Sequence, residues 1–348
     1  MNKLKLKSNK LIPLFLFLFA SIVVCAQKGG LPLADEYYKA GEYEKAKSIY
    51  ENFTGNLESS RYVYEKYLVC LTQVKDYEGA EKFLKKVIKW DNQNPVYKID
   101  LATLYLKQNK SSEAKKQLDK VLNATKENVE LVGPTAQYLL KQGYMDAAKQ
   151  VYLTGRKTQK NDFYYSLELA EIYKQEKKSD EMITELIRVL LMNQNDKEFR
   201  KAKFQDFITT DEEFKKFEQA IIGKIQEDPG QYLYNDLLIW LYVQQRDFYR
   251  AFIQAKAYDK LTKSPGNKLM EIGRIALENK DYEVSVEIFE YVAKEYKSTF
   301  NYATARKLKI QAKEEMIKNV FPINKPQIRS LIGDYNQLIK ELGKNQQT

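Results

Sequence analysis

The residue types that carry most enzyme and metal chemistry are nearly absent from this chain. It contains no histidine and two cysteines, Cys25 and Cys70. Without histidine there is no Ser–His–acid arrangement, no Cys–His pair and no histidine metal site. Cys25 lies in a leader segment, and the single thiol that remains is too few for a zinc or iron–sulfur cluster. Because Cys70 stands in the apolar phrase YLVCLTQV, we expect it to pack in the core.

Two short motifs resemble a phosphate loop or a calcium loop but lack residues that such loops require. GNKLMEIG lacks both the glycine spacing and the Lys-Ser/Thr ending of a phosphate loop. DNQN at 91–94 lacks the glycine and the closing Glu of a calcium loop. Carboxylates are plentiful, but they alternate with Lys at helical spacing, as in EKAKSIYE, which indicates a solvated face. We therefore expect no catalytic residue, no metal and no cofactor, and a carboxylate-only enzyme is the alternative that stays open.

Residues 1–26 have the layout of a secretory signal peptide. Four lysines precede the apolar run LIPLFLFLFASIVV, and Val24 and Ala26 suit a cut between Ala26 and Gln27. The apolar run is shorter than the roughly 20 residues that span a bilayer. The sequence therefore predicts an exported protein that is periplasmic or associated with the cell envelope. An uncleaved anchor and a lipid anchor at Cys25 are the alternatives, and Val24 stands where a lipoprotein needs a small residue.

Composition predicts a helix-rich protein whose partners are not nucleic acids. The 348 residues are 44% hydrophobic and 30% charged, with only 14 Gly and 8 Pro to make tight turns. Removing the four leader lysines lowers the net charge from +10 to +6. The remaining charges of both signs are interleaved, as in EKFLKKVIKWDNQ, whereas a nucleic-acid site needs clustered cations.

A phrase with an aromatic residue, charges and a small residue returns along the chain. Aligned on the small residue, successive copies stand at Ala46, Ala80, Ala114, Ala147 and Met182, with nearly equal intervals between them. Ala251 and Ser285 are separated by the same interval. A period of about 34 residues is typical of a solenoid of helix hairpins, in which each hairpin covers the apolar face of the one before.

The phrase itself predicts the start of a second helix in each hairpin. An N-cap side chain is needed there to accept a backbone N–H of the first turn. Asp76, Asp247 and Asp281 stand directly before the aromatic residue. Ser111 and Ser179 stand at the aromatic position itself, and we expect them to cap as well.

The period and the residue pattern resemble the tetratricopeptide repeat family. Three positions before the small residue the family has a Tyr-like residue, and this chain has Tyr43, Tyr77, Ser111, Tyr144, Ser179, Phe248 and Tyr282. Twelve positions before it the family has a small or apolar residue, and this chain has Ala34, Leu68, Ala102, Thr135, Ala170, Ile239 and Gly273. The resemblance covers about residues 31–190 and 230–296. It implies an all-α, right-handed alpha-solenoid of antiparallel helix hairpins.

The expected organisation has five parts. A signal peptide at 1–26 precedes five tetratricopeptide-like repeats at 27–190, and 231–297 holds further repeats. Residues 191–230 lack the signature and are interpreted as a degenerate helical hairpin. Residues 298–348 form C-terminal helices that either cap the array or belong to a truncated further repeat.

One helix is nevertheless predicted within 191–230. Thr210 and Glu213 have the spacing of a capping box at the start of TTDEEFKKFEQAIIGKIQ. One face of that helix is apolar, with Phe214, Phe217, Ile221 and Ile225.

The resemblance also implies a surface. In the family the first helices of successive hairpins line a concave groove that holds an extended peptide or a partner helix. The family alignment places ten residues of this chain there: Tyr38, Lys39, Tyr62, Gln73, Lys107, Glu171, Lys174, Trp240, Gln244 and Arg274. Aromatic anchors there would supply affinity and charged residues selectivity. Trp240 suits a place in the core equally well.

These expectations together describe an exported scaffold that binds another protein or a peptide segment and has no catalytic activity. Its oligomeric state is open, and a peripheral attachment to the membrane is compatible with the leader. One alternative is a small-molecule or glycan binder with an aromatic-lined pocket near residues 191–250. Another is an accessory repeat domain of a longer, multidomain envelope protein.

Overall fold

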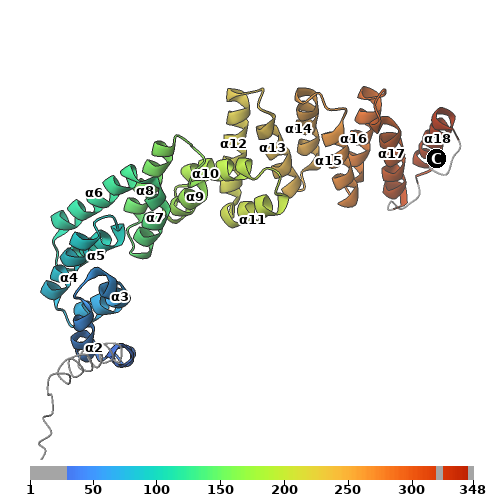
Figure 1. Cartoon of the computed structure of the whole chain (residues 1–348). Coiled ribbons are helices and arrows are strands. Elements are labelled where there is room, and N and C mark those ends of the chain that lie inside the picture. Colours follow the sequence, from blue (N-terminus) through green and yellow to red (C-terminus); the bar gives the residue numbers. More distant parts are fainter. Residues whose placement is uncertain (1–29, 319–323, 344–348) are drawn as a thin grey trace, which may run out of the picture. The chain divides into compact units, whose positions relative to one another are not determined.

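The structure is a computed structural model that describes residues 30–318 and 324–343 (Figure 1). Within these ranges every regular element is a helix, and successive helices are joined into hairpins. This confirms the expected all-α solenoid of helix hairpins. The predicted signal peptide, with its cut between Ala26 and Gln27, lies outside the described residues.

The chain divides into two compact units, Met1–Tyr164 and Tyr165–Thr348. In the first unit residues 30–39 are helical. They are followed by α2 (Tyr43–Tyr50), η1 (Glu51–Phe53), α3 (Leu57–Gln73), α4 (Tyr77–Trp90), α5 (Pro95–Lys107), α6 (Ser111–Glu127), η2 (Val129–Leu131), α7 (Val132–Lys141) and α8 (Met145–Gln159). The second unit contains α9 (Ser166–Gln175), α10 (Ser179–Met192), α11 (Lys197–Phe207), α12 (Asp211–Glu227), α13 (Tyr232–Gln244), α14 (Phe248–Leu261), α15 (Asn267–Glu278), α16 (Tyr282–Glu295), α17 (Asn301–Lys318) and α18 (Lys325–Leu342).

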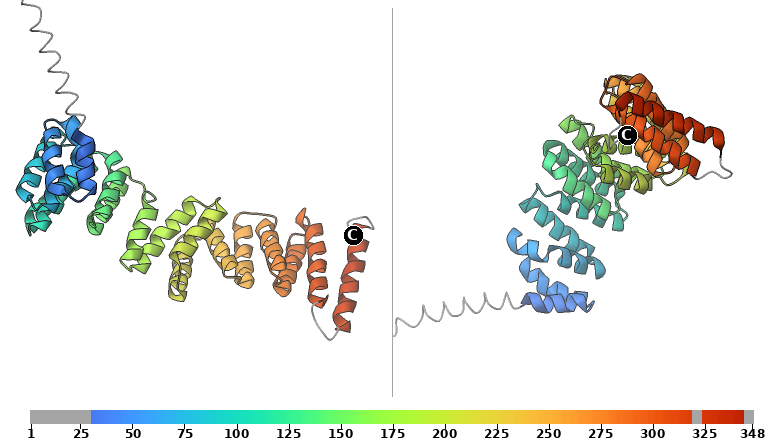
Figure 2. Two further views of the ribbon diagram at one scale, coloured as in Figure 1. Left: turned by 90° about the horizontal axis from the view of Figure 1, so that it is seen from below. Right: turned by 90° about the vertical axis from the view of Figure 1, so that its right-hand side faces the viewer.

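Within each unit the helices alternate between two roles. We call the helix at residues 30–39 and α3, α5 and α7 of the first unit, and α9, α11, α13 and α15 of the second, the first helices of their hairpins. Each is followed after a short turn by a second helix, and most consecutive helices within a unit pack against each other (Figure 2). This arrangement repeats because each helix has one apolar face, which its neighbours on both sides bury.

The predicted aspartate caps are confirmed, and the predicted serine caps are wrong. The carboxylates of Asp76, Asp247 and Asp281 accept the backbone N–H three residues on, at 2.9, 3.0 and 3.3 Å. Helices α6 and α10 instead begin at Ser111 and Ser179, and the residue before each helix has no side-chain cap. A serine in the first helical position has its hydroxyl inside the turn, so it does not reach the free N–H groups as a cap does.

The small residues mark the seam between the two helices of a hairpin. Ala46, Ala80 and Ala114 are all buried, as expected. In the fourth hairpin the buried small residue is Ala148, because α8 begins at Met145 and Tyr144 precedes the helix. The predicted alignment on Ala147 was therefore one residue early. With this correction, the interval between successive small residues is constant from Ala46 through Met182.

Cys70 packs in the core of the first unit, as predicted. It is fully buried among tyrosine, leucine and valine side chains of α3 and its neighbours. Burial raises the pKa of the Cys70 thiol to about 11, so the thiol is protonated and unreactive at neutral pH.

The segment 191–230 is an integral part of the core of the second unit. The predicted capping box is present: Thr210 accepts the N–H of Glu213 at 3.2 Å, and Glu213 accepts the N–H of Thr210 at 3.0 Å. The predicted apolar face of α12 packs inward, with Phe217 and Ile221 buried and Phe214 and Ile225 partly buried. One further helix, α11, adds the buried side chains Phe204 and Phe207.

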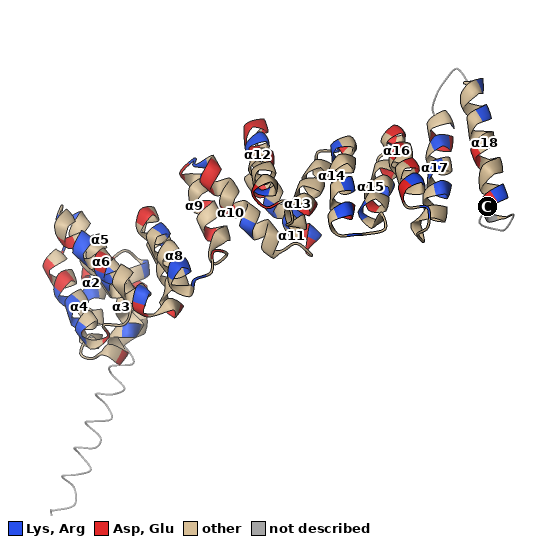
Figure 3. Cartoon of the chain, turned by 90° about the horizontal axis from the view of Figure 1, so that it is seen from above, with Lys and Arg blue, Asp and Glu red and all other residues tan. Residues whose placement is uncertain are grey.

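The last described pair of helices is α17 and α18. On α18, Leu338 is buried against its neighbours, whereas Ile332 is 53% exposed, so the apolar side chains of this helix are only partly covered. Lysines and arginines alternate with carboxylates along the described helices, as the sequence predicts (Figure 3). Among the described residues, no helix combines the length and the apolar character needed to cross a membrane.

Candidate functional site

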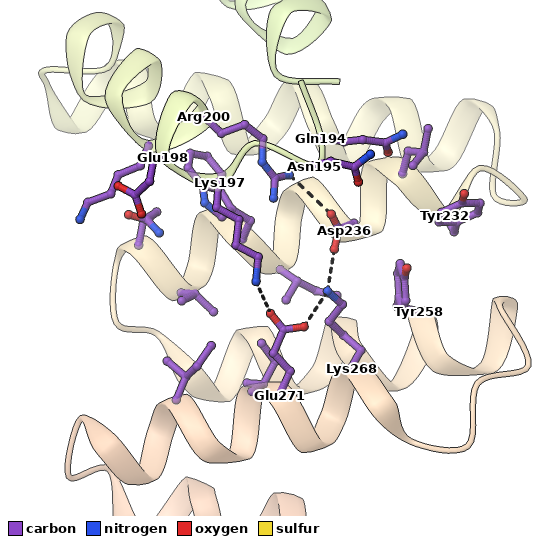
Figure 4. A pocket seen from close by; sticks show the side chains of 18 residues that line it. Gln194, Asn195, Lys197, Glu198, Arg200, Tyr232, Asp236, Tyr258, Lys268 and Glu271 are labelled. Atoms are coloured by element: carbon purple, nitrogen blue, oxygen red, sulfur yellow. Dashed lines mark hydrogen bonds and ion pairs between the residues drawn. The ribbon is translucent and has the colours of Figure 1, made fainter. Parts of the chain in front are cut away.

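A hollow of about 620 Å³ opens on three consecutive first helices of the second unit (Figure 4). Its walls are α11, α13 and α15, with Tyr258 of α14 and Asn195 at the edge. We call it the α11–α13–α15 hollow. Its size lies within the range of roughly 300–1,000 Å³ that is usual for ligand pockets.

Four charged contacts connect the three helices around this hollow. Arg200 Nη1 lies 3.5 Å from Asp236 Oδ2, and the other Asp236 oxygen lies 2.9 Å from Lys268 Nζ. Lys268 Nζ also lies 3.0 Å from Glu271 Oε2, and Glu271 Oε1 lies 3.2 Å from Lys197 Nζ. Because Lys197 and Arg200 are one turn apart on α11, the contacts close a loop (Figure 4). We call these five residues the charged ring.

The charged ring holds three cations and two carboxylates. Burial opposes the charge on Lys268, but Asp236 and Glu271 beside it raise its pKa above the ordinary value. Burial likewise opposes the charge on Glu271, but Lys268 and Lys197 hold the pKa of its carboxyl below the usual range. Both groups are therefore charged at neutral pH, and the ring carries one positive charge in excess.

Two capping carboxylates place the cations of the ring. Asp196 accepts the N–H of Phe199 at 2.9 Å and starts α11, which puts Lys197 and Arg200 on its first turn. Asp259, at the end of α14, accepts the N–H groups of Lys268 and Leu269 at 3.1 Å each. The cations of α11 and α15 thus have fixed backbone positions.

Arg200 and Trp240 are two buried side chains in the lining of the hollow. Arg200 is 4% exposed, and its guanidinium carbon lies 5.4 Å from the centroid of the Trp240 ring. Phe204 packs edge-on against the same ring, with the centroids 5.3 Å apart. Trp240 is 9% exposed, so it is a core residue with one edge in the hollow, which reconciles the two places predicted for it.

Two tyrosines stand at the mouth of the hollow. The ring of Tyr232, which is 43% exposed, lies 5.8 Å from the ring of Tyr258 in an edge-on arrangement. Lys268 Nζ lies 5.3 Å from the centroid of Tyr258. The hollow therefore combines the aromatic surface of these tyrosines and Trp240 with charge.

The predicted groove residues do not all meet at one place. Trp240 and Gln244 line the α11–α13–α15 hollow, and Lys107 lines a smaller hollow in the first unit. Six others are exposed on their helices: Lys39, Tyr62, Gln73, Glu171, Lys174 and Arg274. Tyr38 is partly buried beside Tyr43. Their role in binding stays a prediction.

Lys174 has a structural contact that the sequence did not indicate. Its ammonium donates to the backbone carbonyl of Asp206 and lies 5.3 Å from the centroid of the Phe207 ring. It thereby joins α9 to the end of α11, so it contributes to packing as well as to the surface.

Sequence reasoning missed the charged ring. Lys197 and Arg200 lie in the segment without a repeat signature, so the family alignment gave them no position. On α13 and α15 the alignment selected the later turns of the helices. Asp236 lies one turn before Trp240, and this spacing is the one signal that would have pointed to it.

The described residues hold no group of three or more Asp, Glu and Cys side chains arranged to bind a metal ion. A family model described as tetratricopeptide repeat matches residues 71–133, from the end of α3 to the start of α7. The resemblance inferred from the sequence is thus confirmed for this segment. A comparison with curated proteins finds no match.

Solved structures of repeat proteins are similar to the chain along most of its length. A tetratricopeptide repeat protein from Parabacteroides merdae has 12% identity and a TM-score of 0.27, covering 82% of this chain and 98% of that one. The C-terminal part of a repeat-containing protein from Cytophaga hutchinsonii has 16% identity and a TM-score of 0.26, covering 86% and 99%. The P58(IPK) repeat domain has 15% identity and a TM-score of 0.23, covering 92% and 100%.

Proposed function

We propose that this chain is an exported scaffold that binds a segment of another protein on the exposed face of its first helices, without catalysis. The tetratricopeptide repeat match supports the general role, because such repeats serve in protein–protein interaction. The observation that carries the specific proposal is the α11–α13–α15 hollow. It lies on first helices, where the family resemblance implies binding, and includes two of the ten predicted groove residues.

The chemistry of the hollow suits a partner side chain with both apolar and polar parts. Binding energy at interfaces comes mainly from a few aromatic anchors, and the hollow offers two: Trp240, which is buried, and Tyr232, which is 43% exposed. The charged ring adds selectivity among partners. A partner group that enters the hollow displaces water from these charged side chains, so only a group of complementary charge or hydrogen bonding restores the lost interactions. A short segment of a partner would bury one or two side chains in the hollow.

Capture from envelope fractions tests this proposal. The mature protein is immobilised as the wild type, as Tyr232→Ser and as Tyr249→Ser, and the bound proteins are quantified by mass spectrometry. Tyr249, on α14, is 53% exposed and does not line the hollow, so it is a matched control. We expect Tyr232→Ser to lower the capture of a specific partner about tenfold, as for the loss of an aromatic anchor. Equal capture by all three proteins would contradict docking in the hollow.

Export is a separate part of the proposal, and the leader sequence supports it. Mass spectrometry of the native protein should find a mature N-terminus at Gln27 in the periplasmic or envelope fraction. A lipid-modified N-terminus at Cys25, or an intact leader, would overturn the proposed cleavage.

A small-molecule or glycan ligand is the second candidate function. One observation favours it: the hollow has an aromatic mouth and lies where the repeat signature is interrupted, near residues 191–250. A ligand of this kind should raise the melting temperature of the wild type. The increase should be lost in Tyr232→Ser and kept in Tyr249→Ser.

A further inference from the structure

The first unit has a smaller hollow, of about 250 Å³, on its own first helices α3, α5 and α7. Asp100 of α5 lies between Tyr64 of α3 and Tyr138 of α7. We call this the Asp100 hollow. Its volume is suited to one side chain of a bound molecule.

Asp100 is a buried carboxylate, and none of the ion pairs among the described residues includes it. It is 7% exposed and accepts hydrogen bonds from the hydroxyl groups of Tyr64 at 2.5 Å and Tyr138 at 2.7 Å. Among the described residues, no Lys or Arg nitrogen lies within 4.0 Å of its oxygens, in contrast to Asp236 in the charged ring. A buried charge that is hydrogen-bonded but has no opposite charge keeps a large desolvation cost.

Part of the lining of the Asp100 hollow is apolar. Leu68 and Val69 come from α3 and Leu104 from α5, and the ring of Tyr138 faces the same space from α7. Apolar walls beside a carboxylate complement an alkyl chain that ends in an ammonium group. The chain would bury its methylene groups while the nitrogen meets the carboxylate.

Three more charged side chains line the hollow: Glu65, Lys107 and Lys141. Glu65 and Lys107 are exposed, and Lys141 Nζ lies 6.0 Å from the centroid of the Tyr138 ring. Together with Asp100 these four side chains have a net charge of zero, so their combined electrostatic field neither attracts nor repels a cation at long range. Direct contact with the buried Asp100 carboxylate therefore determines whether a cation binds, because electrostatic interactions are strongest where water is excluded.

We propose that the Asp100 hollow binds the side chain of a lysine from a partner segment, with its primary ammonium against the Asp100 carboxylate. The site lies in the other unit of the chain and does not depend on docking in the α11–α13–α15 hollow. Thr72 and Thr103 also line the hollow, with their hydroxyl groups donating to backbone carbonyls of their own helices.

The first test uses n-butylammonium chloride as the probe, at constant ionic strength, with ligand-observed NMR on the mature protein. n-Butanol, of the same size and uncharged, is the control ligand. We expect saturable binding of n-butylammonium that weakens at least tenfold in Asp100→Asn, whose amide oxygen accepts from one of the two tyrosines while its NH2 group donates to the hydroxyl oxygen of the other. Glu58→Gln removes the same charge from an exposed position of α3 that does not line the hollow, and it should change the affinity less than threefold. Equal binding of n-butanol, or equal binding by Asp100→Asn, would overturn the proposal.

The second test needs no variant. The pH titration of the Asp100 carboxyl carbon is followed by NMR in the wild type, with and without n-butylammonium. Burial raises the pKa of the Asp100 carboxyl, and a cation in contact with it lowers that pKa. We expect the midpoint to move to lower pH when the probe is present, and an unchanged midpoint would exclude contact with Asp100.

The third test asks where the ammonium comes from. Nα-Acetyl-lysine amide should bind more tightly than putrescine, because its backbone reaches the rim of the hollow. Tighter binding of putrescine would overturn the assignment to a partner lysine. None of these results depends on Tyr232, so failure here and failure of the capture experiment are separate outcomes.

Discussion

The hydroxyl of Ser285 donates to the backbone carbonyl of Gly273 at 3.1 Å, joining α16 to α15 where no side chain separates them. Both residues occupy the small positions of their hairpin. A Cβ atom on Gly273 would lie 2.7 Å from the ring of Phe289, which is fully buried. The close approach of the two helices therefore depends on the absence of a side chain at 273.

Gly273→Ala should consequently destabilise the protein by about 1–3 kcal/mol, since an extra carbon in a packed interior forces the ring or the helix to move. Gly223→Ala is the matched control, because it also lies in a helix and its Cβ would meet nothing within 4 Å. That change should stabilise by about 0.5–1 kcal/mol, as Gly→Ala does in a helix interior. Urea unfolding measures both, and equal effects would show that α15 and α16 do not meet at Gly273.

The residues of the charged ring should contribute unequally to the free energy of unfolding. Asp236→Ala leaves the buried Arg200 and the partly buried Lys268 without a shared carboxylate, so we expect a loss of about 2–4 kcal/mol. Lys197→Ala removes a side chain that is 71% exposed and should cost less than about 0.5 kcal/mol. The comparison uses the free energy of unfolding in urea. Similar costs for the two variants would mean that the ring is solvated throughout.

Thr210 and Ser111 were both predicted to cap a helix, but only the loss of the Thr210 hydroxyl should lower the stability of the protein. Thr210→Ala removes a cap that accepts the N–H of Glu213, and should cost about 1 kcal/mol. Ser111→Ala changes a residue inside the first turn of α6 and should have almost no effect, or stabilise slightly. The melting temperatures of the two variants, measured in parallel, give the result. A larger loss of melting temperature for Ser111→Ala than for Thr210→Ala would show that Ser111 does cap α6.

The stability of the protein should depend on pH through Asp100. Burial raises the pKa of its carboxyl in the folded state above the unfolded value of about 3.9. The folded state thus binds the proton more tightly, and this contribution is complete below pH 3.9 and lost as the pH rises through the folded pKa. The free energy of unfolding, measured upward from pH 4, should decline less steeply with pH in Asp100→Asn than in the wild type. Parallel curves would mean that Asp100 does not titrate across this range.

The architecture could be predicted from the sequence because the pattern of each repeat depends on residues that are close together along the chain. The recurring interval between small residues, the caps at Asp76, Asp247 and Asp281, and the inward face of α12 all follow from neighbours along the chain. The error at Ala147 arose because two alanines stand together and Tyr144 resembles the aromatic that starts a second helix. Only the packing shows that α8 begins one residue later.

The candidate site could be predicted only in part. Trp240 and Gln244 follow from the position of α13 in the repeat, and both line the α11–α13–α15 hollow. The charged ring needs contacts from Lys197 to Glu271, which are 74 residues apart, and these arise from the stacking of three hairpins. No spacing within one repeat encodes that stacking, and α11 has no repeat signature to place it.

The central claim is that partners dock on the first helices at the α11–α13–α15 hollow. Its most direct test is photo-crosslinking in the native cell, with a benzoylphenylalanine at position 244 in the hollow or, as the control, at position 249 on α14. We predict that the probe replacing Gln244 forms a discrete protein adduct identifiable by mass spectrometry, and that the probe replacing Tyr249 does not. Adducts of equal yield from both positions, or from position 249 alone, would contradict the account.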